Sequence, residues 1–241
     1  MLSSRSAFLT VLLLPLTLSS CASNGSGGAD ADPATAPGGA TSAHTFDFDD
    51  GVGSPPDGWK VGTSNRRTGS SHATWMRRRE ATSPSDPNVL ALTDARGHVG
   101  QAFNLCWTSA VSLADVDIEV DVHIDGGRED QGGGPAWRID GENDYYTARW
   151  NPLEDNFRVY SVKDGERLQL DSARVQADPQ AWHTIRVRHV GDSITCWLDG
   201  VELLHAQDSK LPEAGGVGLW TKADATTWFD DLTVWPADRI R

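Results

Sequence analysis

A run of alternating acidic residues offers the first recognisable chemistry in this sequence. Asp117 and Glu119 stand two positions apart in the segment 115–124, and His123 follows four positions later. Retaining glycoside hydrolysis uses two carboxyl groups about 5–5.5 Å apart, a separation that alternate residues of one strand provide. Asp117, Glu119 and His123 are therefore candidate catalytic residues. The alternative is a solvated strand face whose charges are balanced by nearby arginines.

Aromatic and arginine side chains offer a second kind of chemistry, because sugars stack on aromatic rings and bond to a few fixed polar groups. Alternation along the hairpin 182–199 turns Arg186, Arg188 and Trp197 to one outward face. Tyr145 and Arg149 form a similar outward pair on 144–151. These five residues are candidate carbohydrate contacts. Alternatively, Trp197 packs on an arginine through a cation–π contact worth about 0.5–1 kcal/mol.

The elements that must position these residues are short β-strands. Apolar residues alternate with period two from Phe46 onward, most clearly in 115–124, where the valines and isoleucines share one face. Asp-Gly pairs at 164–165 and 199–200 predict tight hairpins, whereas the glycine-rich run 126–134 predicts a loop. The expected strands are 45–48, 74–80, 88–93, 99–107, 115–124, 135–140, 144–151, 156–162, 166–170, 182–190, 193–199, 201–205, 215–220 and 226–235. Such a pattern indicates an all-β sandwich.

Five segments carry a family resemblance. They are Gly133-Gly-Pro-Ala-Trp-Arg-Ile-Asp with Asn143-Asp-Tyr-Tyr-Thr-Ala-Arg-Trp, then Ala181-Trp-His-Thr-Ile-Arg-Val, then Gly215-Gly-Val-Gly-Leu-Trp-Thr-Lys with Phe229-Asp-Asp-Leu-Thr-Val. Together they resemble the 3-keto-disaccharide hydrolase domain family, in order, from about Thr45 to Trp235. The resemblance implies a concanavalin A-like, laminin-G-like jelly roll, a β-sandwich of two antiparallel sheets.

The resemblance also bears on activity. It implies hydrolysis of 3-keto-glycosides, and it adds Arg138 to the candidate carbohydrate contacts, since this residue matches the arginine of the family's Trp-Arg segment. Where hydrolytic members tend to carry a histidine after the Gly-x-Gly-Leu strand, this chain has Thr221-Lys222. Asp115–Glu119 looks like a degenerate form of the retaining β-glucanase motif, with aspartate in place of its first glutamate. Whether the protein is an enzyme stays open on these grounds.

A calcium site is expected where the two ends of the domain meet. Jelly rolls usually pair their first and last strands, which would bring Asp47 and Asp49 near Asp230. Calcium takes six to eight oxygen ligands from such loops, and Asp230 matches a position that often binds structural calcium in relatives with this fold. The alternative is ordinary turn chemistry. No other cofactor is expected.

The N-terminus resembles a bacterial lipoprotein signal. Arg5 precedes an apolar run, and Leu18-Ser-Ser-Cys21 ends it. We expect residues 1–20 to be a signal peptide and Cys21 to carry the lipid, in an outer-membrane type of lipoprotein; a plain secretory signal is the alternative. Residues 21–43 lack large apolar side chains and predict a flexible linker. The domain then occupies residues 44–241.

Charge and cysteine content narrow the partners. The formal net charge of −13 opposes binding to nucleic acid and to anionic lipid, so the lipid would be the only membrane contact. Cys106 and Cys196 permit either one disulfide or two buried thiols. The sequence has no CxxC pair, which argues against a structural zinc site.

These observations together predict a lipid-anchored protein of the bacterial cell envelope that binds a carbohydrate or glycan on the concave face of its sandwich. A hydrolase of 3-keto-glycosides or 3-keto-disaccharides is the alternative, and a structural or adhesive envelope module is the second. The sugar and the oligomeric state are not predicted.

Overall fold

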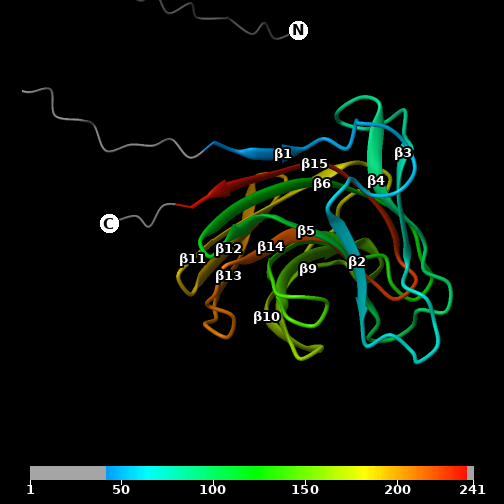
Figure 1. Ribbon diagram of the computed structural model, residues 1–241. Coiled ribbons are helices and arrows are strands. Elements are labelled where there is room, and N and C mark those ends of the chain that lie inside the picture. The colour runs from blue at the N-terminus through cyan, green and yellow to red at the C-terminus, as the bar shows by residue number, and fades with distance from the viewer. Residues whose placement is uncertain (1–41, 238–241) are drawn as a thin grey trace, which may run out of the picture. The chain divides into compact units, whose positions relative to one another are not determined.

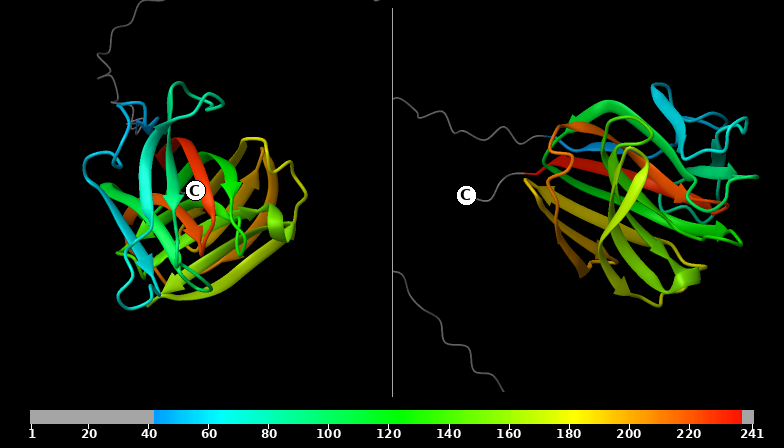
Figure 2. Two further views of the ribbon diagram at one scale, coloured as in Figure 1. Left: turned by 90° about the vertical axis from the view of Figure 1, so that its right-hand side faces the viewer. Right: turned by 90° about the horizontal axis from the view of Figure 1, so that it is seen from below.

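The computed structural model describes residues 42–237 of the chain. Two antiparallel sheets lie face to face in these residues (Figures 1 and 2), which confirms the predicted two-sheet jelly roll. We name them sheet A and sheet B. The expected signal peptide, Cys21 and most of the expected linker lie outside the described residues. Within residues 42–237, no helix has the length and apolar character needed to cross a membrane.

Sheet A has eight strands. Its main path runs β13 (Val201–Gln207), β12 (Ser193–Leu198), β11 (His183–Val190), β6 (Val116–Gly126), β15 (Thr226–Pro236), β4 (Asn88–Asp94) and β3 (Thr74–Arg79), and β1 (His44–Phe46) pairs with β15. The first and last strands therefore pair, as the sequence predicted, with Thr45 opposite Thr233.

Sheet B has seven strands. They run in the order β10 (Glu166–Arg174), β9 (Asn156–Lys163), β8 (Tyr145–Asn151), β7 (Gly133–Ile139), β14 (Gly215–Lys222), β5 (Phe103–Leu113) and β2 (Trp59–Ser64). A short 3-10 helix, η1 (Pro152–Glu154), joins β8 to β9. Strands β7 to β10 are consecutive in the chain and lie side by side, and β14, β5 and β2 complete the sheet next to β7.

The core forms between the sheets from the alternation seen in the sequence. On β6 the apolar residues Val116, Ile118, Val120, Val122 and Ile124 are all buried in it. Burying one such side chain contributes about 1.5–3 kcal/mol relative to leaving it exposed. The acidic residues of the same strand consequently lie on the outer face of sheet A.

The hairpins follow from their turn residues. Asp164 and Gly165, and likewise Asp199 and Gly200, all have positive φ angles, between 51° and 78°. These are the conformations of a type I′ turn, which Asp-Gly favours. The turns set the pairing of β9 with β10 and of β12 with β13.

The two described cysteines are free buried thiols, so the disulfide alternative is wrong. Cys106 is on β5 of sheet B and Cys196 is on β12 of sheet A. Both side chains belong to the core between the sheets. Burial raises the pKa of both thiols, which keeps them protonated and unreactive.

Candidate functional site

The outer face of sheet B is concave because the two edges of the sheet are joined. Asn65, directly after β2 at one edge, donates from Nδ2 to the carbonyl of Gly165 at 2.8 Å. Gly165 lies in the β9–β10 turn at the other edge, and its N–H donates to the carbonyl of Asn143 at 2.9 Å. The sheet is therefore rolled into a trough. Central strands β7 and β8 are buried on both faces as a result.

Aromatic side chains form the floor of one half of this trough. The Tyr145 hydroxyl accepts a hydrogen bond from Trp220 Nε1 at 3.1 Å and lies 3.2 Å from Ser64 Oγ. Phe103 packs against Trp220 with ring centroids 5.6 Å apart. Burial raises the pKa of Tyr145, so its hydroxyl remains neutral. All three aromatic side chains are fully buried, so they form a packed apolar layer beneath the trough with one fixed hydroxyl.

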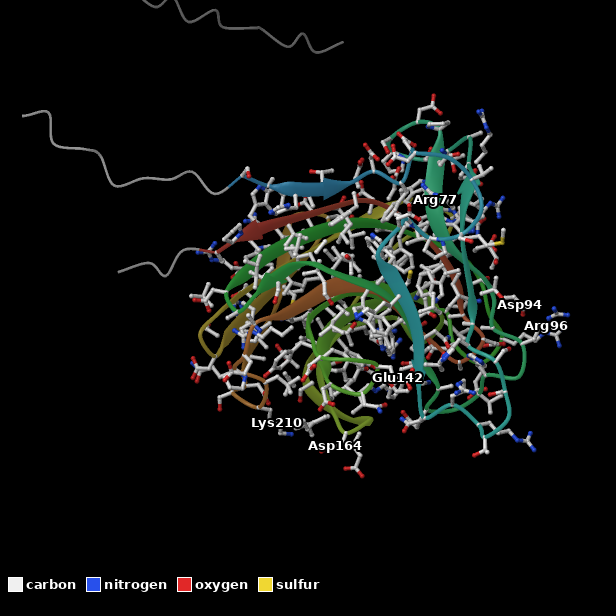
Figure 3. The ribbon with its side chains drawn as sticks, viewed as in Figure 1. Arg77, Asp94, Arg96, Glu142, Asp164 and Lys210 are labelled. Atoms are coloured by element: carbon white, nitrogen blue, oxygen red, sulfur yellow. The ribbon has the colours of Figure 1, made fainter. Side chains whose placement is uncertain are left out.

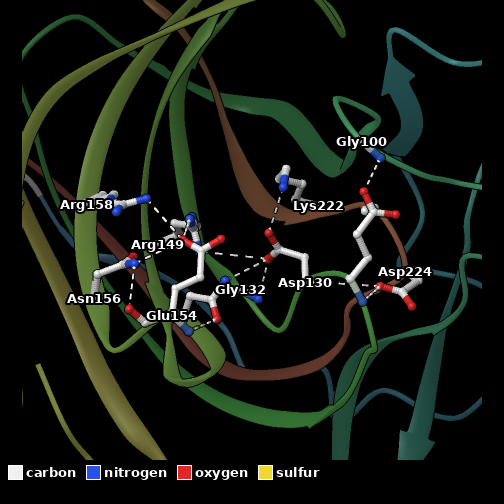
Figure 4. Close-up of polar contacts among 12 residues, drawn as sticks. Gly100, Asp130, Gly132, Arg149, Glu154, Asn156, Arg158, Lys222 and Asp224 are labelled. Atoms are coloured by element: carbon white, nitrogen blue, oxygen red, sulfur yellow. Dashed lines mark hydrogen bonds and ion pairs between the residues drawn. The ribbon is translucent and has the colours of Figure 1, made fainter.

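A buried charged cluster forms the other half (Figure 4). Asp130 is 0% exposed, and its Oδ2 accepts from Lys222 Nζ at 2.9 Å. Its Oδ1 accepts from Asn151 Nδ2 at 3.1 Å and lies 3.8 Å from Arg149 Nη1. An ion pair taken this far out of water holds only when each charge keeps its partners. Asp130 is therefore the centre of the cluster.

Arg149 connects Asp130 to a second carboxylate. Its Nη2 donates to Glu154 Oε2 at 2.9 Å and to the Tyr160 hydroxyl at 3.4 Å. Arg158 also donates to Glu154 Oε2, at 3.1 Å. Burial alone would raise the pKa of Glu154, but hydrogen bonds from Asn156 and Arg149 and the charges of Arg149 and Arg158 lower it to about 2. Glu154 is therefore ionised at neutral pH.

The loop between β6 and β7 supplies Asp130 and is itself anchored. The Asp224 carboxylate accepts the backbone N–H groups of Glu129 and Asp130 at 2.9 and 3.1 Å. At Gly132 a Cβ would lie 2.8 Å from Arg149 Cδ, so only glycine lets the loop approach this closely. The glycine-rich loop predicted from the sequence thus brings one acid to the trough, although β6 and β7 extend into the predicted range at Gly126 and Gly133.

Arg167 lies over the aromatic half. Its guanidinium carbon is 4.3 Å from the centroid of the Tyr160 ring and 4.9 Å from that of Phe103. It lines a depression of about 460 Å³ with Asn65 and Gln101. A second depression of about 570 Å³ lies on its other side, where Figure 3 shows Asp164 and Lys210 at the edge of the molecule. Arg167 therefore stands at the mouth of the trough.

The structure divides the predicted carbohydrate contacts between the two sheets. Tyr145 and Arg149 face the trough of sheet B, but both are deeply buried. Trp197, Arg186 and Arg188 lie on the outer face of sheet A, so the predicted single platform does not form. Sequence alternation gave the correct face of each strand but could not show which strands belong to the same sheet.

The Arg138 side chain binds backbone carbonyl groups. The backbone of this residue is left-handed, with φ at 48°, and its side chain is buried. The guanidinium donates to the carbonyls of Ala114, Leu211 and Gly191 at 2.6, 3.0 and 2.8 Å. The residue holds loops together at one end of the sandwich and is not a sugar contact in this arrangement.

The predicted catalytic carboxylates on β6 are engaged by arginines. Asp117 accepts two hydrogen bonds from Arg186, at 2.8 and 2.7 Å, and one from Arg188 at 3.3 Å. Burial raises the pKa of Glu119, which lies opposite Arg186. Asp117 is buried, and both of its oxygens accept from guanidinium groups, so this carboxylate is held as the partner of Arg186 and Arg188. The charge-balanced alternative fits this face, although Asp117 itself is not solvated.

His123 lies apart from that pair, in an aromatic stack. Its ring is 4.6 Å from Trp228 and 5.4 Å from Trp182, and Arg78 lies 4.8 Å from the centroid of Trp228. Its Nε2 is 3.2 Å from the carbonyl oxygen of Gln180. His123 faces outward, as predicted, but it lies on the sheet opposite the trough.

The expected calcium ligands lie close together without forming a metal site. Asp230 accepts from Ser85 N and Oγ at 2.9 and 3.0 Å, and Asp49 accepts from Asn88 N at 2.9 Å. Burial, followed by the charge of Asp231, raises the pKa of Asp230 to about 7 against the Ser85 hydrogen bonds. No group of three or more His, Cys, Asp or Glu side chains within residues 42–237 is arranged to hold a metal ion. Calcium binding by Asp47, Asp49 and Asp230 therefore stays a prediction.

The family of the chain agrees with this fold. The fold and the trough define a two-sheet jelly roll with a recessed polar site on one outer face. Residues 46–235 match the family model of the 3-keto-alpha-glucoside-1,2-lyase-like domain, and the chain belongs to that family. No curated protein matches the chain.

Solved structures share the fold at low sequence identity. The carbohydrate-binding module CBM66 from Bacillus subtilis is 20% identical, with a TM-score of 0.57 over 73% of this chain and 94% of the module. The cellulose-induced protein Cip1 is 15% identical, with a TM-score of 0.59 over 80% and 97% of the two chains. The exoplasmic domain of VIP36 with Ca²⁺ and Man3GlcNAc bound is 13% identical, with a TM-score of 0.51 over 82% and 92%.

Proposed function

We propose that the protein binds a carbohydrate in the trough of sheet B. The observation that carries the proposal is one concavity in which Arg167, held over buried aromatic rings, lies at the mouth and a charged cluster lies at one end, so that a few fixed polar groups converge on an apolar base. Family membership and the carbohydrate-binding jelly rolls named above support it. A sugar would lie beside Arg167, with Tyr160 below it and the Asp130 cluster at one end.

Isothermal titration calorimetry with the full chain tests this proposal after a glycan array has identified a ligand. Tyr160 presents its ring to Arg167 and its hydroxyl to Arg149. Tyr160→Ala is expected to weaken binding at least tenfold, because the buried Tyr160 ring fixes the position of the Arg167 guanidinium beside which the sugar would lie. Trp197→Ala on the opposite sheet is the matched control. Unchanged affinity in a folded Tyr160→Ala variant would contradict the proposed location.

Cleavage of 3-keto-glycosides is a second candidate, supported by family membership and by Lys222. A 1,2-elimination removes the proton on C2, which is acidified by the neighbouring C3 ketone. Water takes up the C2 proton and the C2–H electrons form an enolate with the C3 ketone; the enolate then collapses to the C1=C2 bond as the C1–O bond breaks, and the departing oxygen takes up a proton from water. Fixed cations stabilise the enolate that develops at the ketone oxygen. Lys222 and Arg149, both held by Asp130, are the cations that would do this.

The product distinguishes elimination from hydrolysis. Elimination from 3-keto-trehalose gives an unsaturated ketone that absorbs ultraviolet light, whereas hydrolysis gives 3-keto-glucose, which has no conjugated double bond. We expect the full chain to form the unsaturated ketone and Lys222→Met to lose that activity. Release of 3-keto-glucose alone would favour the hydrolase alternative, and no turnover would remove the enzyme candidate.

We also propose that the chain is anchored to the cell envelope through a lipid on Cys21, on the lipoprotein-like segment described above. Mass spectrometry of the purified protein is expected to show an acylated N-terminal cysteine. Cys21→Ala is expected to move the protein from the membrane fraction to the released fraction. A Cys21→Ala protein that stays in the membrane fraction would contradict the anchor. An adhesive module with a protein partner stays the remaining alternative.

A further inference from the structure

The trough carries more positive than negative side chains, although the chain as a whole has a net charge of −13. The cations are Arg149, Arg158, Arg167 and Lys222, whereas only Asp130 and Glu154 pair with members of this set. At the mouth, Lys163 pairs with Asp144 at 2.7 Å, and Lys210 lines the same depression as Asp164 and Glu166, so the positive side chains there are balanced by acidic ones. The excess of positive charge therefore stays inside the trough.

Arg167 is the one member of this set of four cations that forms no ion pair in the described residues. No carboxylate within residues 42–237 forms an ion pair with it, although Glu166 lines the same depressions. Its Nη1 is buried and donates to no protein atom. Burial lowers the pKa of its guanidinium, so the surroundings disfavour the charge that this group must carry. A buried cation without an anionic partner is costly, because desolvation is not repaid.

Contact with aromatic rings offsets only part of the desolvation free energy of the Arg167 guanidinium. A cation–π contact contributes about 0.5–2 kcal/mol depending on exposure, and it satisfies none of the N–H groups. The position of Arg167 over Tyr160 and Phe103 therefore fixes where the guanidinium lies without supplying the acceptor that it lacks. That acceptor must come from outside the protein.

Arg149, which also contacts the Tyr160 ring, shows the same shortage of acceptors. Its guanidinium carbon is 5.9 Å from that ring's centroid, and the side chain is 1% exposed. Its Nε and Nη1 are buried and donate no hydrogen bond, since Asp130 stays 3.8 Å from Nη1. Two guanidinium groups with unused donors thus lie over one tyrosine ring. Guanidinium donors in this fork geometry match the two oxygens of a carboxylate.

We propose that the trough takes a saccharide that carries a carboxylate, that is, a uronic acid or a glycan ending in one. The carboxylate binds Arg167 from the depression of about 460 Å³ that Arg167 lines with Asn65 and Gln101, a volume suited to one or two sugar rings. This inference rests on the proposed carbohydrate binding at sheet B and names the class of sugar.

Matched sugar pairs test it by calorimetry on the full chain. Cellobiouronic acid is compared with cellobiose, and digalacturonic acid with galactobiose, because the members of each pair differ only in their carboxylate groups. At least one acidic sugar is expected to bind ten times more tightly than its neutral partner at low salt. The advantage should shrink as ionic strength rises. A disaccharide sulfated at the same carbon is the third ligand in each set.

Variants assign the effect to Arg167. Arg167→Gln is expected to remove the preference for the acidic sugar, while Arg167→Lys keeps its salt dependence with a weaker affinity. Arg186→Gln, on the outer face of sheet A, is the matched control and should leave the preference unchanged. Thermal denaturation of each variant confirms that it is folded.

The outcomes distinguish failure of the carboxylate assignment from failure of the proposed carbohydrate binding. Equal binding of acidic and neutral members overturns the carboxylate assignment and leaves carbohydrate binding intact. Equal binding of sulfated and carboxylated sugars assigns the site to negative charge in general and also overturns it. Failure of every acidic and neutral sugar to bind contradicts both proposals.

Discussion

The outer faces of the two sheets hold similar residues in opposite electrostatic states. On sheet A, Arg186 and Arg188 share Asp117, and Arg186 lies 5.3 Å from the Trp197 ring. On sheet B, Arg167 lies over aromatic rings but has no carboxylate partner. An arginine beside an aromatic ring therefore does not identify a binding site by itself. The unused donors on one face and the satisfied donors on the other make the difference.

Curvature separates the two faces as well. Arg186 and Arg188 have side chains 45% and 30% exposed, so water screens their charges. The Arg149 side chain is 1% exposed, and Asp130 is fully buried. The same ion pair has a larger effect on stability where water is excluded, because removing one partner leaves a desolvated charge behind.

The largest predicted effect is therefore on sheet B. Asp130→Asn leaves Lys222 and Arg149 without their shared carboxylate and is expected to lower the free energy of unfolding by about 3–5 kcal/mol. Asp117→Asn removes the corresponding carboxylate on sheet A, where the exposed arginines limit the loss to about 1 kcal/mol. Urea unfolding followed by tryptophan fluorescence measures both. Equal losses would refute the contrast between the faces.

A pH effect on sheet A comes next. The pKa of Asp230 is raised from 3.8 to about 7, chiefly by burial, so the folded state holds this proton more tightly than the unfolded state. Its contribution to stability is complete below about pH 4 and is lost as the pH rises through 7. We expect the melting temperature of Asp230→Asn to fall less than that of the native chain between pH 5 and 8. Parallel curves for the two proteins would contradict the raised pKa.

Glu154 on sheet B should give a smaller effect with the opposite sign. Its pKa is lowered from 4.5 to about 2 through Asn156, Arg149 and Arg158, so it stabilises the fold above about pH 4.5 and loses that contribution as the pH falls toward 2. Because the side chain is 36% exposed, Glu154→Gln is expected to cost only about 1 kcal/mol at pH 7. Acid titration of both proteins should show their stabilities converging below pH 3.

The smallest expected effect is that of Trp197→Ala on sugar binding. Trp197 lies on sheet A, opposite the trough, and contacts Arg186. Affinity for a carbohydrate ligand is expected to stay within about twofold of the native value. A tenfold loss with the fold intact would move the binding site to sheet A, and it would revive the single platform that the sequence suggested.

Strand alternation made much of the sandwich predictable. Residues Val116 to Ile124 alternate cleanly because β6 has one face in the core and one outside. By contrast, β2 was missed, since Gly62 and its polar neighbours give no such alternation. Strands β7, β8 and β14 are buried on both sides, so their sequences do not reveal which face is the trough.

The candidate site was less predictable for a topological reason. Arg149 was singled out from its own strand, but Asp130 comes from a loop, and Arg167 comes from the edge strand β10. Only the rolling of sheet B places Arg167 against Phe103 of β5, which lies five strands away in the sheet order. Lys222 had one signal, its place where related sequences tend to carry a histidine. Local spacing cannot show contacts across a curved sheet.

In sheet B, the residues that hold the sheet in its rolled shape differ from the residues that line the trough and would select a ligand. The contact between the two edges is the bond from the Asn65 side chain to the Gly165 carbonyl, and the bond from Gly165 N–H to the Asn143 carbonyl ties the β9–β10 turn to the β7–β8 turn. Substitutions at positions such as 158, 167 and 222 change the lining without touching that frame. Related proteins could therefore exchange one sugar specificity for another by a few side-chain replacements while the rolled sheet persists.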